Sequence, residues 1–308
     1  MQRSGRERWY AGRGRGGTMA DEAVEILAHK SRVNDVAFSP DGKFLVSAGR
    51  DRLVKLWSPG DWELFSTFFG HEKSADSLSF TPDGERLATA SADRTVRLWT
   101  FPFGKPEETL EGYTSARVSP RGDLVASRDR EDRIRLWSLA SGEVRATLDH
   151  EARVTATAFS PDGERLLAAP EGREVVCWSV ESGEEEGRFQ AGESAVAALR
   201  FFDDGRRLVA TGHGGTARVF AADGWDDVLR FEVGSEGAFP LAVAPDGSEL
   251  AVACAHRVRI FDADEGTLRE ERKVKPEGIY ALAYSPDGRW LVGGAGDKKI
   301  RVWERDAA

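Results

Sequence analysis

The sequence predicts an all-β protein built from seven copies of one unit of about 41 residues. The first observation is a Pro-Asp-Gly turn or a close variant, whose glycines are Gly42, Gly84, Gly122, Gly163, Gly205, Gly247 and Gly288. The second is a bulky aromatic residue 14 or 15 positions after each glycine: Trp57, Trp99, Trp137, Trp178, Phe220, Phe261 and Trp303. The third is that no segment shows a sustained 3.6-residue hydrophobic period, which would predict helix.

Each unit predicts four short strands, and the second copy shows them most clearly. Residues 75–80 form the first strand and end at a turn in which Pro82 presets φ and Gly84 supplies the positive φ of a tight hairpin. Residues 86–91 and 95–99 follow as the second and third strands, and the third is β-branched and aromatic, as a sheet prefers. A weaker fourth strand is expected near residues 107–110.

These units resemble WD repeats, which form the blades of β-propellers. The resemblance rests on the repeat length, on Gly70-His71, and on the block from Asp93 to Trp99, Asp-x-x-Val-Arg-Leu-Trp. The Trp-Asp pair of the family is absent, since the tryptophan is followed by Ser, Thr or Glu. The resemblance covers about residues 22–304 and implies a seven-bladed β-propeller of four-stranded antiparallel blades.

The chain ends predict how such a ring would close. The last copy stops after its third strand at Trp303, whereas residues 22–27 match the fourth-strand position ahead of the first copy. We therefore expect the N-terminal strand to complete the last blade and cover its edge. Deletion of residues 19–28 should then loosen the propeller or make it aggregate. In the third copy, the connection before the first strand is four residues shorter than in the second.

Charge and composition limit the function classes. The net charge is −9, but residues 1–18 carry five arginines against one glutamate, or +4, so the remainder carries −13. An acidic body argues against nucleic-acid binding by the propeller, and no apolar run is long enough to span a membrane. We expect residues 1–18 to be a disordered Arg/Gly-rich tail or a mis-assigned start before Met19, and residues 19–308 to be one propeller. Cys177 and Cys254 are expected to be packed thiols.

Three histidines occupy one position of the repeat, 13 residues before the turn glycine: His29, His71 and His150. In WD repeats this histidine is hydrogen-bonded through a Ser or Thr and an Asp to the tryptophan. The resemblance carries this structural network over to two sets, which are His29, Ser47, Asp51 and Trp57, and His71, Thr89, Asp93 and Trp99. A catalytic Ser-His-Asp site would need an exposed nucleophile and an oxyanion hole, and the repetition favours a buried network instead.

The function expected from the resemblance is that of a non-enzymatic scaffold or adaptor for other proteins. Alternative functions are a TolB-like accessory propeller, or a propeller that binds a phosphorylated ligand or RNA. We expect no cofactor, no metal and no catalytic residue. A cytoplasmic, monomeric protein without membrane contact fits the absence of an export signal.

A partner surface can be located from the repeat. The connections between fourth and first strands lie on the same rim of the propeller as those between second and third strands, and we call this the mouth rim. The Pro-Asp-Gly turns lie on the opposite rim, which we call the turn rim. Within each repeat, a few positions on this rim should point their side chains toward the mouth of the channel. The residues at these positions are Arg32, Asn34, Arg50, Asp76, Arg130, Arg153, Thr155, His213, Phe239 and Tyr280. The arginines predict binding of an acidic segment of a partner, with Phe239 and Tyr280 across the mouth from them. The alternative is that the arginines pair with neighbours such as Asp35, Asp76 and Glu131.

Overall fold

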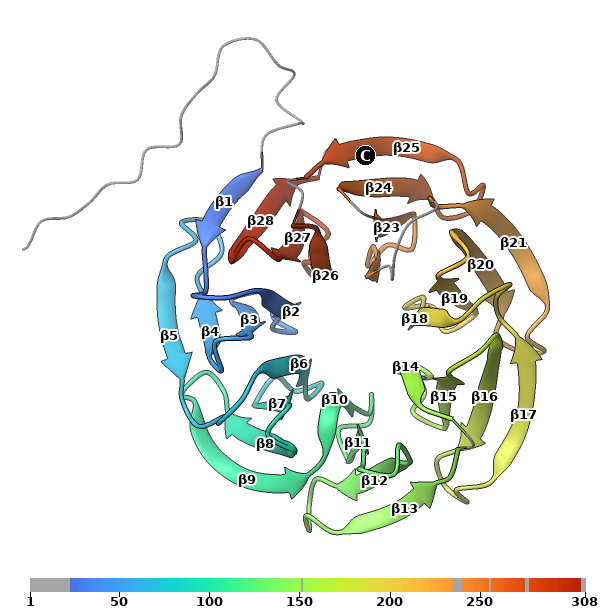
Figure 1. The fold of residues 1–308 in the computed structure, drawn as a ribbon, viewed down its shortest axis with the longest axis horizontal. Helices are drawn as coiled ribbons and strands as arrows, with labels where there is room; N and C mark the ends of the chain where they lie inside the picture. Colours follow the sequence, from blue (N-terminus) through green and yellow to red (C-terminus); the bar gives the residue numbers. More distant parts are fainter. Residues whose placement is uncertain (1–22, 151, 235–239, 255, 275–276, 306–308) are drawn as a thin grey trace, which may run out of the picture.

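The computed structural model is a ring of seven four-stranded antiparallel sheets around a central channel (Figure 1). It describes residues 23–150, 152–234, 240–254, 256–274 and 277–305. Every regular element in these ranges is a strand, so the prediction of an all-β, seven-bladed propeller is confirmed. No helix capable of crossing a membrane occurs within the same ranges.

The four strands of a blade follow one another outward from the channel, and we call them strands a to d. Blade one contains β2 (Val33–Phe38), β3 (Leu45–Gly49), β4 (Val54–Trp57) and β5 (Leu64–Phe68). Blade two contains β6 (Ala75–Phe80), β7 (Arg86–Ser91), β8 (Thr95–Thr100) and β9 (Lys105–Glu111). Blade three contains β10 (Tyr113–Val118), β11 (Leu124–Arg128), β12 (Ile134–Ser138) and β13 (Val144–Leu148). Only Gly112 separates β9 from β10, which is the short connection that the sequence predicts.

The remaining blades repeat this order. Blade four contains β14 (Val154–Phe159), β15 (Arg165–Pro170), β16 (Glu174–Ser179) and β17 (Glu185–Gln190). Blade five contains β18 (Val196–Phe201), β19 (Arg207–Gly212), β20 (Thr216–Ala221) and β21 (Asp227–Glu232). Blade six contains β22 (Leu241–Val243), β23 (Glu249–Cys254), β24 (Arg257–Asp262) and β25 (Leu268–Lys273). Blade seven contains β26 (Ile279–Tyr284), β27 (Trp290–Ala295), β28 (Lys299–Glu304) and, as strand d, β1 (Val24–Leu27).

The ring closes through the first strand of the chain. β1 pairs antiparallel with β28, in a register that places Val24 opposite Val302 and Leu27 opposite Lys299 (Figure 1). Glu25 adds ion pairs to Lys299 and to Arg301. The predicted closure by the N-terminal strand is therefore confirmed, and it removes the free edge that β28 would otherwise expose.

The turn glycines also join neighbouring blades. Gly42 and Gly84 have φ values of 69° and 72°, which a residue with a side chain rarely adopts. An added Cβ on Gly84 would lie 3.5 Å from Pro40 of the preceding blade, and one on Gly42 would lie 3.8 Å from Pro286. These two turns thus both reverse the chain and pack on the proline of the preceding turn around the rim.

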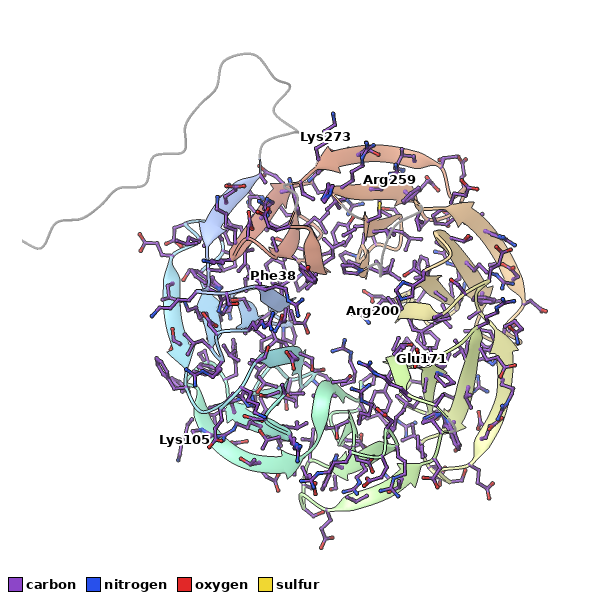
Figure 2. All side chains as sticks on the ribbon, viewed as in Figure 1. Phe38, Lys105, Glu171, Arg200, Arg259 and Lys273 are labelled. Atoms are coloured by element: carbon purple, nitrogen blue, oxygen red, sulfur yellow. The ribbon has the colours of Figure 1, made fainter. Side chains whose placement is uncertain are left out.

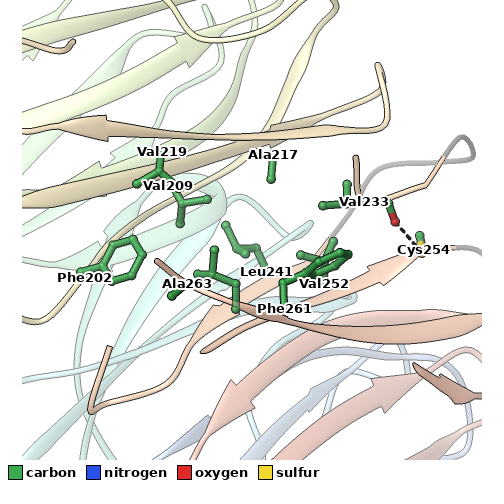
Figure 3. Packing of buried hydrophobic residues seen from close by; sticks show 11 residues of the cluster. Phe202, Val209, Ala217, Val219, Val233, Leu241, Val252, Cys254, Phe261 and Ala263 are labelled. Atoms are coloured by element: carbon green, nitrogen blue, oxygen red, sulfur yellow. Dashed lines mark hydrogen bonds between the residues drawn. The ribbon is translucent and has the colours of Figure 1, made fainter. Parts of the chain in front are cut away.

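The hydrophobic core is divided into clusters that lie between blades rather than inside one blade. Figure 3 shows the cluster between blades five and six, where Phe202, Leu241 and Phe261 are buried together. Cys254 belongs to this cluster, and its thiol lies 3.3 Å from the carbonyl oxygen of Val233. Cys177 is buried in the adjoining cluster, where burial raises the pKa of its thiol to about 11. Both cysteines are unpaired, packed thiols.

In blades one, five and six, a cationic side chain of strand c ties the blade to the one before it. Lys55 Nζ donates to the carbonyl oxygen of Ala28 (2.5 Å), which directly follows the closing strand β1. Arg218 and Arg259 make the equivalent bonds to the carbonyl oxygens of Gln190 (2.9 Å) and Val233 (3.0 Å). Because these carbonyls end the strand d of the preceding blade, the cations satisfy backbone acceptors at the blade junctions.

Candidate functional site

The seven strands a surround a cavity of about 720 Å³ that runs along the channel (Figure 2). Residues from all seven blades line it, and most of them are small. Charged side chains interrupt this lining at Asp35, Asp76, Arg117, Arg128, Arg153, Glu171 and Arg200. The channel wall therefore holds four arginines against three carboxylates.

A β-bulge at the start of strand a directs side chains toward the mouth of this cavity. The pairing register between strands a and b shifts between Val33 and Asp35 in blade one, and at the same point in blades two, four, five and seven. The residue skipped by the register is Asn34 in blade one, Asp76 in blade two, Thr155 in blade four and Tyr280 in blade seven. A bulge leaves one residue unpaired and re-aims its side chain.

The structure brings most of the ten predicted mouth residues to the cavity. Those that line it are Asn34, Asp76, Arg153, Thr155, His213 and Tyr280. Arg32, Arg50 and Arg130 are outside this lining, and Phe239 lies outside the described residues.

Asn34 links the mouth of blade one to that of blade two. Its Nδ2 donates to Ser74 Oγ (2.8 Å), to the Ala75 carbonyl oxygen (2.8 Å) and to Asp76 Oδ1 (3.0 Å). Burial raises the pKa of Asp76, against the lowering effects of the Ser74 hydrogen bond and of Arg32. These polar groups are engaged with one another, so they form a fixed wall of the mouth.

Arg32 and Tyr280 lie side by side, because ring closure places blade seven next to blade one. The guanidinium carbon of Arg32 stands 4.4 Å from the centre of the Tyr280 ring, and Arg32 Nε donates to Asn34 Oδ1 (2.8 Å). The prediction that Tyr280 faces the arginines from across the mouth is therefore wrong with respect to Arg32. Arg50 lies next to Arg32, since the backbone N–H of Arg50 donates to the carbonyl oxygen of Arg32 (2.9 Å).

At the turn between strands b and c of blade three, Arg128 lines the cavity and the predicted Arg130 does not. Arg130 pairs with Glu111 (3.3 Å), and both side chains are about half exposed. Arg128 instead donates from Nη1 to the Val154 carbonyl oxygen (3.0 Å) and pairs with Asp132 (3.2 Å). The backbone of this turn keeps the register of blades one and two, since Asp132 has the positive φ that Arg52 and Arg94 have there. Asp129 supplies its buried carboxylate.

Blade four contributes Arg153 and Thr155 to the mouth. Thr155 Oγ1 lies 2.6 Å from the Val196 carbonyl oxygen of blade five, so it ties two strands a together. Arg153 is exposed, and its side chain makes no hydrogen bond or ion pair with the residues that the structure describes. Burial, together with the nearby charge of Arg153, lowers the pKa of Arg128 against the opposing effect of Asp132.

Three charged residues deeper in the channel were missed by the sequence reasoning. Arg117 and Arg200 occupy the position five residues before the turn glycine, where the other five blades have Ala or Ser. Asp35 occupies the position seven residues before the turn glycine, where the other six blades have Ser, Ala or Pro. The sequence could have identified these three residues, because each is a charged residue at a repeat position that is occupied by small residues in the other blades. Figure 2 shows Arg200 reaching into the central opening.

The two histidine networks lie away from the channel, inside blades one and two. His71 Nδ1 lies 2.9 Å from Asp93 Oδ2, and since a carboxylate only accepts, this nitrogen donates. His71 Nε2 then accepts from Thr89 Oγ1 (2.7 Å), which also accepts from Trp99 Nε1 (2.9 Å). The same chain joins His29, Ser47, Asp51 and Trp57, at 2.8–3.0 Å.

Burial defines what these networks can do. Ser47 and Thr89 are both 0% exposed, so neither hydroxyl can reach a substrate. Desolvation lowers the pKa of His71, although Asp93 acts in the opposite direction. A buried histidine held between two partners fixes the positions of strands b and c.

A protein-family model described as WD domain, G-beta repeat matches residues 22–58, 62–100, 142–179 and 270–304. The chain is a WD-repeat propeller. The four matches fall on blades one, two, four and seven. Blades five and six carry Phe220 and Phe261 in place of the tryptophan, and blade three lacks most of the connection that contains the Gly-His pair.

Several curated proteins are similar to this chain over a length of one or two repeats. The chain is 40% identical over 58 residues to intraflagellar transport protein 122 homolog of Danio rerio, covering 19% of this chain and 5% of that protein. It is 47% identical over 45 residues to ribosome assembly protein 4 of Saccharomyces cerevisiae, covering 15% and 9%. It is 49% identical over 47 residues to nuclear distribution protein PAC1 of Coccidioides posadasii, covering 15% and 10%.

These matches span about a tenth or less of each relative's length, and the three names denote different processes. The similarity between this chain and these relatives therefore reflects the WD repeat that they share, and it does not indicate a common pathway. WD-repeat propellers generally bind other proteins, which indicates a protein-interaction role for this chain.

Proposed function

We propose that this propeller is a non-enzymatic scaffold whose mouth rim binds an acidic segment of a partner protein. The observation that carries the proposal is the set of arginines at the mouth. Arg50 and Arg153 are exposed, and neither side chain pairs with a residue that the structure describes. Arg32 contributes a guanidinium over the ring of Tyr280, a residue that remains 47% exposed.

Arginine and tyrosine are the residue types that most often anchor protein interfaces. Arg32 and Tyr280 form one such pair already oriented in the unbound protein, which reduces the side-chain entropy lost on binding. Arg153 lies on blade four and Arg32 on blade one, so an extended segment crossing the mouth could contact both sides. Residues 19–308 carry a net charge of −13, so a local group of arginines would attract an acidic ligand to this rim.

Arg130 is not part of the proposed surface, because it pairs with Glu111 and does not line the cavity. The predicted alternative of pairing with neighbours holds for this arginine, although Glu111 and not Glu131 is its partner. The WD-repeat matches favour a scaffold over a TolB-like accessory propeller.

The test is charge reversal at the mouth. Arg32, Arg50 and Arg153 are changed together to Glu, and binding is measured by fluorescence anisotropy with a labelled acidic peptide and by quantitative pull-down. Each arginine truncation at a desolvated contact should cost on the order of 1–2 kcal/mol of binding free energy. Binding should also weaken as salt shortens the Debye length from roughly 10 Å toward 3 Å.

The matched control reverses three arginines outside the mouth, Arg145, Arg188 and Arg206. This variant carries the same change in net charge, and it should retain binding if the position of the charges matters. Melting curves establish that both variants are folded. Equal loss of binding in the two variants, or unchanged binding in the mouth variant, would refute the proposal.

A further inference from the structure

Two arginines project into the deep part of the channel, where the fold otherwise places small residues. The position five residues before the turn glycine is occupied in five blades by Ala37, Ser79, Ala158, Ala242 and Ala283. Blades three and five carry Arg117 and Arg200 there, and both line the cavity. The position belongs to strand a near its turn-rim end, so these side chains lie below the mouth residues.

Most of the hydrogen-bond donors of these arginines are unused. A guanidinium group has five N–H donors. In Arg117, Nη1 alone is bonded, to the carbonyl oxygens of Ala116 (3.2 Å) and Leu78 (3.4 Å). In Arg200, Nη1 alone is bonded, to the carbonyl oxygen of Leu199 (2.9 Å). Neither Nε nor Nη2 of either residue has a partner among the described residues.

The charge of the pair is incompletely balanced. Asp35 interacts electrostatically with both arginines, but no oxygen of Asp35 forms an ion pair with either of them within the described part of the chain. Its two oxygens instead accept the N–H groups of Val36 and Leu78, both at 2.9 Å. Burial raises the pKa of Asp35. Burial and the nearby charge of Arg117 lower the pKa of Arg200 to about 10.

Two cations, of which Arg200 is desolvated by burial, therefore face one carboxylate that is itself held by backbone donors. A buried charge without a counter-charge is costly, and an anion in the channel would remove that cost. Guanidinium groups bind carboxylate and phosphate groups through paired N–H donors. The cavity of about 720 Å³ lies within the range of small-molecule sites.

We propose that the channel binds a small anionic ligand, bearing carboxylate or phosphate groups, between the guanidinium groups of Arg117 and Arg200. Arg153 and Arg128 line the same cavity nearer the mouth and form a cationic path to this site. The site lies deeper in the channel than the acidic-segment surface and shares only Arg153 with it, since Arg117 and Arg200, which would hold the ligand, are not part of that surface.

The experiment uses pyrophosphate and citrate as probes, with sodium chloride at matched ionic strength as the reference. Binding is measured by isothermal titration calorimetry, and the melting temperature is recorded at each probe concentration. We expect saturable binding of at least one probe, and the probe that binds more tightly identifies phosphate or carboxylate as the preferred group. Arg117→Ala and Arg200→Ala should each weaken binding by roughly tenfold or more, as expected for a lost charged hydrogen bond.

The fold itself supplies controls for these variants. Alanine or serine stands at the same position in five other blades, so the substituted strands should still form. Arg145→Ala, on the outer strand β13, removes the same charge far from the channel and should leave binding unchanged. Without any probe, Arg200→Ala should melt at the same temperature as the native protein or higher, because it removes a desolvated and repelled cation.

Three results would overturn the proposal. The first is that neither probe binds beyond the sodium chloride reference. The second is that the double variant of Arg117 and Arg200 binds as tightly as the native protein. The third is a fall of several degrees in the melting temperature of probe-free Arg200→Ala, which would assign this arginine to structural support of Asp35.

Discussion

The rings of His150 and Trp178 meet edge to face at 5.4 Å, yet neither His150 Nε2 nor Trp178 Nε1 has a hydrogen-bond partner in the described part of blade four. In blades one and two a hydroxyl group joins these two nitrogens, supplied by Ser47 or Thr89. Ala168 occupies that position in blade four and has no hydroxyl to offer. Blade four thus keeps the histidine and the tryptophan, but it lacks the hydroxyl between them and has Gly172 at the position of the aspartate.

Ala168→Ser should therefore stabilise the protein. The new hydroxyl can donate to His150 and accept from Trp178, so two buried polar atoms gain a partner. The net gain should be about 1 kcal/mol in the free energy of unfolding, or roughly 2–3 °C in melting temperature. Ala169→Ser is the control, because Ala169 is buried in an apolar cluster and its hydroxyl would find no such pair. Stabilisation by both variants, or by neither, would contradict this account.

Blade three replaces the histidine network with an ionic one. The Asp129 side chain is 3% exposed and accepts from Arg133 (2.8 Å) and Arg135 (3.1 Å). Asp129→Ala should lower the free energy of unfolding by about 2–3 kcal/mol, because Arg135 loses its carboxylate and Arg133 keeps only the exposed Glu131 and Asp149. Glu131→Ala is the matched control: this carboxylate also contacts Arg133 but is 60% exposed, so its loss should cost less than about 0.5 kcal/mol. Chemical unfolding measures both. Similar costs would mean that burial does not determine the strength of these pairs.

Closure of the ring should depend on the inward face of β1. Ile26 packs against the buried cluster that contains Val302, whereas Val24 is 46% exposed. Ile26→Asp should detach β1, lower the melting temperature by several degrees and expose β28 as a free edge that promotes aggregation. Val24→Asp adds the same charge to the outer face and should change little. Light scattering and melting curves follow both, and deletion of residues 19–28 should resemble Ile26→Asp.

Acid should weaken the network of blade two between pH 4 and pH 2. Desolvation raises the pKa of Asp93, but hydrogen bonds from Thr95, the Glu72 N–H and His71 outweigh it and hold the pKa at about 2. The folded protein therefore binds this proton less readily than the unfolded chain, whose carboxylate titrates near 3.9. The stabilisation is complete above that value and is lost as the pH falls toward 2.

Asp93→Asn isolates this contribution. Allowing for solvent screening of a partly exposed carboxylate, the pH-dependent part should amount to roughly 1 kcal/mol. Urea unfolding at a series of pH values should show a steeper decline for the native protein than for Asp93→Asn. Parallel profiles would show that Asp93 does not contribute to acid sensitivity.

The sequence alone determined the number of blades, the order of their strands and the two complete histidine networks. Each of these signals lies within one repeat, as in the spacing from His71 through Asp93 to Trp99, and local spacing survives without knowledge of the ring. Several mouth residues, such as Asn34 and Tyr280, could also be predicted from their position in the repeat. The reason is that the bulge at the start of strand a recurs at the same position in both blades.

Relationships between blades were decided by the tertiary structure. Arg32 stacks on Tyr280 because closure by β1 brings the last blade beside the first, and no spacing within a repeat encodes that contact. The same holds for Arg117 and Arg200, which belong to different blades and interact only because both strands line one channel. A repeat specifies which way each side chain points, whereas the angle between successive blades specifies which side chains meet.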